Sequence, residues 1–243
     1  MIAPPPANEI VFLPGFDGVA ELRGEFVEAM GREYPSRAVG YPDRKLDSLN
    51  GYARHVASHM LPESRPVVIA ESFSGLVAAR WAAQDPHVAG LVLCGAFARS
   101  PVPWAALGAS MPSMAQFLGA NFLNPMAYAS GDPARRRWSE ALAAALRSMH
   151  REVIAERLTL IATEDVSVEL KALRIPVFIV HFDDDLVIGA GARGHLESVC
   201  HNAEIVRVPG PHFAIETRPR ESAAAIAPRL AQLFGKSLPR TGT

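Results

Sequence analysis

Cysteine is scarce in this sequence, which has only Cys94 and Cys200 among its 243 residues. Two cysteines are too few for a disulfide framework or a cysteine-rich zinc site, and both have apolar neighbours. We therefore expect two buried free thiols. This use of cysteine is typical of a reducing compartment and predicts a cytoplasmic protein.

An excess of charge and long apolar runs are also lacking. The 24 Lys and Arg and 25 Asp and Glu give a formal net charge of −1, which provides no general attraction to nucleic acid or acidic membranes. No apolar run approaches the roughly 20 residues that cross a bilayer. The start, MIAPPPAN, has neither the basic region nor the apolar segment of a signal peptide. We expect a soluble protein that neither binds nucleic acid nor inserts into a membrane.

What the sequence does contain is an alternation of strand and helix patterns. Short apolar runs bounded by turn residues predict strands, and apolar residues at helical spacing predict helices. The expected strands cover residues 9–13, 36–41, 65–71, 88–96, 175–181 and 203–208. The expected helices cover residues 20–34, 46–60, 76–83, 191–200 and 218–234. This alternation indicates an α/β fold with a mostly parallel, doubly wound sheet.

Residues 100–166 interrupt the alternation. They contain helical segments without a convincing strand, and several prolines divide them. We interpret this stretch as a helical cap inserted into one core domain, which residues 1–99 and 167–243 form. The chain is long enough for a single α/β core with a large buried interior.

Ser72 stands at an abrupt change from strand to helix, in Ala70-Glu-Ser-Phe-Ser74. So tight a corner needs small residues on both sides, and Ala70 and Ser74 provide them two positions away. The pattern matches the nucleophile elbow, written G-x-S-x-G in its commonest form. Such a corner exposes the serine oxygen, and the free N–H groups at the helix start face any oxyanion formed beside it. The alternative is that Ser72 or Ser74 only caps the helix.

A serine nucleophile needs a base, and the base needs a group that fixes its tautomer. His212 follows the last expected strand in a Pro/Gly loop and is the candidate base, the alternative being a surface histidine. Asp183, Asp184 and Asp185 follow the strand at 175–181. Burying three adjacent carboxylates would cost much solvation energy, so we expect one of them to point inward.

With these residues the sequence resembles the α/β-hydrolase superfamily over nearly its whole length. The order serine, acid, histidine is the order found in that superfamily. In family members the acid commonly stands two positions before a Leu-Val pair, here Leu186-Val187. The resemblance therefore implies a triad of Ser72, Asp184 and His212.

The resemblance also implies an oxyanion hole made by the backbone N–H groups of Phe16 and Phe73. Phe16 follows Gly15 in the loop after the first strand, and Phe73 follows the nucleophile. The sequence departs from the family pattern at Pro14, where a histidine is often found. It departs again at His181-Phe182, which replace a glycine-led turn before the acid.

The cap contains apolar residues that suit a deformable acyl or alkyl pocket, although most cap residues of this kind pack the cap onto the core. The candidate pocket residues are Trp104, Met111, Met114, Phe117, Phe122 and Met126. The cap is also locally basic, with Glu140 as the only acidic residue among five arginines. These arginines are Arg135, Arg136, Arg137, Arg147 and Arg151. They are either a solvated helical face or a surface that attracts an acidic, carrier-linked or carboxylate-bearing substrate.

The function expected from these features is a cytoplasmic serine hydrolase that cleaves a carboxylic ester or thioester through an acyl-enzyme on Ser72. Within the superfamily, the chain resembles small capped carboxylesterases, including those that demethylate a carrier-bound acyl chain. The expected partner is thus a small-molecule ester or thioester, in one form linked to a carrier protein. The alternatives are a carbon–carbon bond hydrolase with the same triad and a ligand-binding receptor of the same fold.

No cofactor or metal is expected. Gly189–Gly194 fits G-x-G-x-x-G, but it does not directly follow a strand, and the three preceding aspartates would repel a pyrophosphate. His55 and His59 lie four positions apart, without the glutamate that zinc peptidase chemistry requires.

Overall fold

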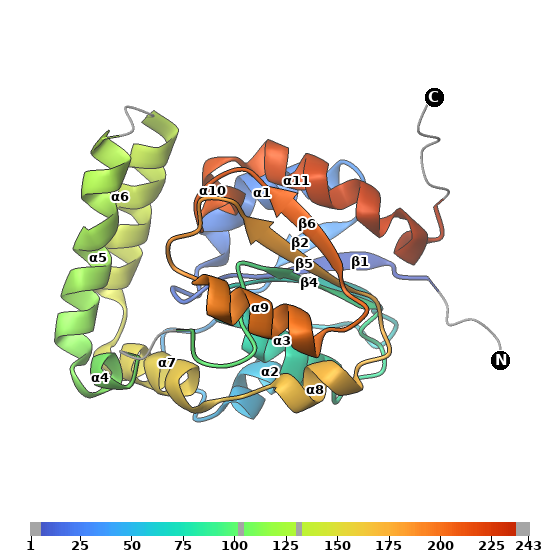
Figure 1. Ribbon diagram of the computed structural model, residues 1–243, viewed down its shortest axis with the longest axis horizontal. Helices are drawn as coiled ribbons and strands as arrows, with labels where there is room; N and C mark the ends of the chain where they lie inside the picture. The colour runs from blue at the N-terminus through green and yellow to red at the C-terminus, as the bar shows by residue number, and fades with distance from the viewer. Residues whose placement is uncertain (1–5, 102–104, 130–132, 237–243) are drawn as a thin grey trace.

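Six parallel strands form one sheet in the order β2-β1-β3-β4-β5-β6 (Figure 1). The computed structural model describes residues 6–101, 105–129 and 133–236, without the side chains of residues 122–129 and 134. The strands are β1 (Glu9–Leu13), β2 (Ser36–Ala38), β3 (Pro66–Glu71), β4 (Gly90–Cys94), β5 (Val177–Phe182) and β6 (Glu204–Val208). Every residue of β3, β4 and β5 is buried, as expected of parallel strands that helices cover on both faces.

Helices cover both faces of the sheet, which confirms the predicted doubly wound α/β fold (Figure 1). One face carries α1 (Gly24–Gly31), α10 (Ala214–Thr217) and α11 (Pro219–Ile226), together with the 3₁₀ helix η2 (Ala227–Phe234). A second 3₁₀ helix, η1 (Ala20–Arg23), directly precedes α1. The other face carries α2 (Leu49–Ala57), α3 (Ser74–Ala82), α8 (Ser167–Ala172) and α9 (Ala190–Val199). None of the described helices is both long and apolar enough to cross a membrane.

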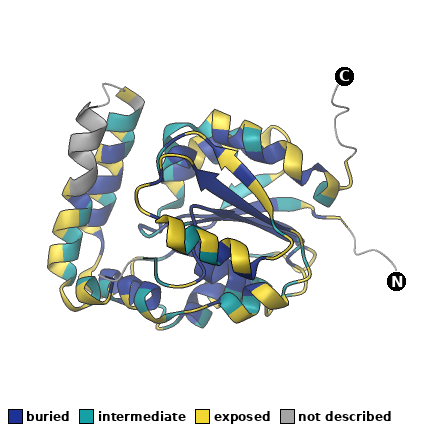
Figure 2. Ribbon diagram, in the orientation of Figure 1, coloured by how far each residue is buried: buried dark blue, intermediate teal, exposed yellow. Residues whose placement is uncertain are grey.

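The central strands are coloured as buried in Figure 2. The buried side chains form two apolar clusters, one on each face of the sheet. Tyr52 and Phe73 belong to the larger cluster, and Phe12 and Phe26 to the other. Cys94 and Cys200 are buried and free, as predicted. The sheet is therefore a rigid platform for the residues that follow its strands.

Four helices lie between β4 and α8 in the chain: α4 (Ala105–Ser110), α5 (Pro112–Ala129), α6 (Pro133–Ser148) and α7 (Arg151–Thr163). Figure 1 shows α5 and α6 side by side as a hairpin that stands apart from the sheet, and α7 close to the core. The two ends of this segment meet at its base. Arg99 and Asp165 form an isolated antiparallel bridge, and the Val166 N–H donates to the Ala98 carbonyl at 2.9 Å. The division into core and cap stays a prediction.

Candidate active site

Ser72 occupies a strained corner between β3 and α3. Its φ is +52°, in the left-handed region that few residues other than glycine adopt. The Ser72 N–H donates to the Cys94 carbonyl at 2.9 Å, which ties the corner to the end of β4. Strain of this kind persists where the surrounding structure enforces it, and it concentrates at functional sites.

His212 and Asp185 form a buried pair at the same edge of the sheet. His212 Nδ1 lies 2.8 Å from Asp185 Oδ2, and both side chains are almost fully buried. The other carboxylate oxygen accepts from the N–H groups of Val187 and Ile188, at 2.8 and 2.9 Å. Burial alone would raise the pKa of Asp185, but the hydrogen bonds from His212 and from these N–H groups outweigh it and lower the pKa. Asp185 is therefore ionised at neutral pH and accepts from the imidazole.

The prediction that Asp184 pairs with His212 is wrong by one position. The Asp184 side chain is exposed, and its N–H donates to the Gly210 carbonyl at 2.9 Å. Asp183 is also exposed and pairs with Arg207 at 3.2 Å. The reason is the turn after β5: the Asp185 N–H donates to the Phe182 carbonyl at 3.2 Å, which turns only the third aspartate inward.

The structure brings His212 to the end of β4, beside the corner that holds Ser72. The imidazole lies over Gly95, where a Cβ atom would be 3.1 Å from His212 Cε1 and Nδ1. Gly95 also has a φ of +52°, so a side chain there would be both strained and obstructed. The hydrogen bonds of the described residues do not include one between the Ser72 hydroxyl and His212. Such bonds are often long in unliganded enzymes and shorten when substrate binds.

The two predicted oxyanion donors lie in the turns that follow β1 and β3, which are neighbouring strands of the sheet. Phe73 directly precedes α3, and Phe16 lies in a turn closed by a hydrogen bond from the Gly18 N–H to the Gly15 carbonyl at 3.1 Å. In the described part of the chain, no hydrogen bond uses the N–H of Phe16 or of Phe73. Both groups are therefore available to an oxyanion.

A buried ionic cluster, which the sequence did not reveal, includes Asp17 of the Gly15–Gly18 turn. Arg23 is 1% exposed and contacts three carboxylates: Asp17 at 2.6 Å, Glu71 at 2.9 Å and Glu216 at 3.0 Å. Burial and the nearby charge of Glu71 raise the pKa of Glu216 well above its ordinary value, despite Arg23. Glu216 therefore holds its proton to higher pH than an exposed glutamate does, and through Asp17 and Glu71 the cluster links the Gly15–Gly18 turn to the residue before Ser72.

The predicted pocket residues remain largely unsupported. Met111, Met114 and Phe117 are about half exposed or more, at 48%, 50% and 63%. Trp104 and the side chains of Phe122 and Met126 lie outside the described residues. A residue that sequence reasoning missed is Trp138 of α6, whose ring lies 4.8 Å from that of Phe213, next to His212.

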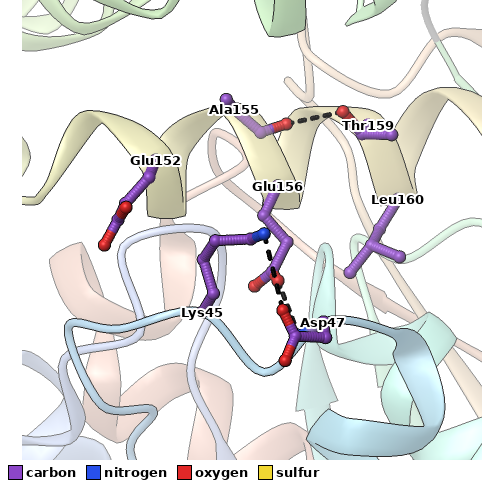
Figure 3. A pocket seen from close by; sticks show the side chains of 7 residues that line it. All are labelled: Lys45, Asp47, Glu152, Ala155, Glu156, Thr159 and Leu160. Carbon is purple, nitrogen blue, oxygen red and sulfur yellow. Dashed lines mark hydrogen bonds and ion pairs between the residues drawn. The ribbon is translucent and has the colours of Figure 1, made fainter.

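A surface cavity of about 450 Å³ lies between α7 and the loop before α2 (Figure 3), and its lining includes none of Ser72, Asp185 and His212. Lys45, Asp47, Glu152 and Glu156 provide its charged lining. Glu156 points from α7 into this loop and accepts from the Asp47 N–H at 2.6 Å. Across the described residues, no group of His, Cys, Asp and Glu has the arrangement of a metal site.

A family model and several solved structures match this chain. The family model described as serine aminopeptidase, S33, matches residues 31–207, which include Ser72 and Asp185 but neither Phe16 nor His212. No curated protein matches the sequence.

Solved structures of hydrolases share the fold. A hydrolase from Pseudomonas aeruginosa PA01 is 18% identical, with a TM-score of 0.74 over 90% of this chain and 88% of the other. An esterase from Rhodococcus sp. ECU1013 is 21% identical, with a TM-score of 0.72 over 93% and 91%. The enol-lactonase from Burkholderia xenovorans LB400 is 17% identical, with a TM-score of 0.68 over 95% and 92%. At these identities the likeness establishes the fold and not the reaction.

Proposed function

We propose that this chain, which belongs to the serine aminopeptidase S33 family of the α/β-hydrolases, cleaves a carboxylic ester or thioester through an acyl-enzyme on Ser72. The observation that carries the proposal is the strained Ser72 corner beside the buried His212–Asp185 pair. Family membership supports a hydrolase, and the esterase and the enol-lactonase among the structural neighbours favour an ester bond.

In the proposed reaction, the Ser72 hydroxyl attacks the carbonyl carbon while His212 Nε2 accepts the hydroxyl proton. Asp185 holds the Nδ1–H of His212, which keeps Nε2 free to act as base and stabilises the imidazolium that forms. The N–H groups of Phe16 and Phe73 donate to the oxygen that becomes negative in the tetrahedral intermediate. His212 then gives its proton to the departing alcohol or thiol, which leaves the acyl group on Ser72. A water molecule deprotonated by His212 releases the acid.

The proposal includes an acidic or carrier-linked form of the substrate. Arg137, Arg147 and Arg151 on α6 and α7 are exposed, and none of the ion pairs formed by the described residues includes them. Exposed positive charge near an apolar cap would attract an anionic carrier and orient its acyl chain.

Labelling with a fluorophosphonate, followed by a panel of esters from short to long acyl chains, tests the nucleophile. Wild type and the exposed-serine control Ser58→Ala should be labelled and should turn over at least one ester. Ser72→Ala should lose the label and several orders of magnitude in kcat. Retained turnover in Ser72→Ala would end the proposal. Labelling without ester turnover would indicate instead a receptor or a carbon–carbon bond hydrolase.

A further inference from the structure

Arg157 is a buried cation that belongs to the cap and contacts the oxyanion loop. It lies on α7, is 1% exposed, and donates from its NH1 group to the Phe16 carbonyl at 2.5 Å. A Cβ atom on Gly18, which has a φ of +76°, would lie 2.7 Å from the same nitrogen. The guanidinium is therefore packed directly against the Gly15–Gly18 turn.

The environment of Arg157 fixes its direction. Its Nε donates to the Tyr52 hydroxyl at 3.1 Å, and its central carbon lies 5.4 Å and 5.7 Å from the ring centroids of Tyr41 and Tyr52. Burial raises the pKa of Tyr52 to about 12, so the hydroxyl keeps its proton and donates it to Glu156 at 3.0 Å. Among the described residues, Arg157 forms no ion pair with a carboxylate. Its charge is balanced through Tyr52 by the neighbouring Glu156.

The bond to Phe16 fixes a peptide that can otherwise rotate. In the turn closed between Gly15 and Gly18, the Phe16 carbonyl belongs to the central peptide, whose orientation distinguishes one turn type from another. The core holds the rest of the loop: Asp17 accepts from the Val19 N–H at 2.8 Å and from Arg23 at 2.6 Å. Arg157 adds a hydrogen bond from α7 to these contacts.

We propose that Arg157 is a positioning residue for the oxyanion hole. It makes the hole depend on the contact between α7 and the Gly15–Gly18 turn, because it holds the turn that presents the Phe16 N–H. This inference rests on the proposed acyl-enzyme function. Arg157 does not contact the reacting atoms. With Arg157 of α7 bound to the Phe16 carbonyl, the turn is fixed with the N–H of Phe16 directed at the developing oxyanion. The Phe16 N–H belongs to the preceding Gly15–Phe16 peptide, so Arg157 acts on it through the backbone of Phe16.

Stability and activity should respond differently to the loss of this side chain. Replacement of a buried charge by an apolar side chain of similar volume is often neutral for stability. Removal of an oxyanion donor costs about 10²–10³ in kcat, and a misplaced donor costs part of that. Arg157→Met should therefore lower kcat about 10- to 100-fold, with KM within about threefold of wild type. Affinity for a trifluoromethyl ketone, whose adduct with Ser72 carries the oxyanion, should fall by the same factor as kcat/KM.

The matched control is Arg80→Met. Arg80 also joins the end of the cap segment to the core, through Glu164 at 3.1 Å and Glu169 at 2.9 Å, but it does not touch the oxyanion loop. It should lose stability without loss of kcat. If Arg157→Met folds poorly, Tyr52→Phe removes only the hydroxyl that orients the guanidinium, and it should lower kcat several-fold with KM unchanged.

The inference is overturned if Arg157→Met and Tyr52→Phe keep kcat and ketone affinity within threefold of wild type, or if they lose no more than Arg80→Met. It is also overturned if KM alone changes, since that would make Arg157 a substrate-binding residue. Fluorophosphonate labelling separates this failure from failure of the proposed function, because unlabelled wild type would contradict the acyl-enzyme itself.

Discussion

At the scale of single residues, the two neighbours Asp184 and Asp185 allow a direct test of the triad. Asp185→Asn keeps an oxygen for the N–H groups of Val187 and Ile188 but leaves the imidazole in the wrong tautomer. We expect kcat to fall by about 10⁴. Asp184→Asn alters an exposed side chain and should stay within threefold of wild type. Steady-state kinetics on one ester measures both, and equal losses in the two variants would contradict the assignment of Asp185.

Glu216 supports a prediction about pH and stability. Because its pKa is raised in the folded state, the folded protein holds this proton to higher pH than the unfolded chain does. Its contribution to stability is therefore complete below about 4.5 and is lost as pH rises through the folded-state pKa. Glu216→Gln keeps the shape and removes the titration. We expect the Tm of wild type to fall relative to that of Glu216→Gln as pH rises from 5 upward.

Thermal unfolding across that pH range measures the difference, and Glu221→Gln, an exposed carboxyl on α11, is the control. Wild type and the control should follow one curve. A constant difference between wild type and Glu216→Gln at every pH would mean that Glu216 does not titrate in this range.

At the scale of elements, α6 and α7 provide the test of the substrate proposal. If Arg137, Arg147 and Arg151 attract an acidic carrier, kcat/KM for an acyl-carrier-protein ester should fall as salt rises from 0.1 to 1 M. Over that range the Debye length shrinks from about 10 Å to about 3 Å. The substitution of all three by Ser should remove most of this salt dependence. A neutral short ester should respond to neither change, and Arg32→Ser, on the surface after α1, is the matched control.

If kcat/KM for the neutral ester and for the carrier-linked ester responds alike to salt and to the substitutions, these arginines form only a solvated surface. It would not bear on the proposed roles of Ser72, His212 and Asp185, because no contact of the described residues joins the three arginines to them.

Elements with strong local signals were predictable, and those set by distant contacts were not. The strands that end at Glu71 and Phe182 have β-branched apolar runs bounded by proline, and they lie where expected. The helix α8 was not expected because it has only six residues and so little periodicity. The prolines of residues 100–166 were expected to separate helices, yet one of them, Pro125, lies within α5, where packing of the helix against α6 outweighs one lost backbone hydrogen bond.

At the scale of the whole molecule, the fold and most of the candidate site follow from the order of strand ends. Ser72 and His212 were identifiable because polar residues directly after buried strands gather at one edge of a parallel sheet. The choice among the three aspartates could not be predicted, because it depends on a turn whose hydrogen bonds leave no pattern in the sequence. Arg23 and Arg157 were missed because an arginine in a sequence predicts exposure. Only long-range contacts with tyrosines, carboxylates and a loop carbonyl reveal that they are buried.

The meeting of Ala98 with Val166 at the base of the cap has a consequence for how such a protein can diverge. A segment whose two ends are already joined can lengthen or shorten without moving β4 relative to β5. The freedom is unequal along the segment. In α7, any change of register would withdraw Arg157 from the Phe16 carbonyl. Descendants of this chain could thus acquire new specificities in the α5–α6 hairpin while α7 stays constrained.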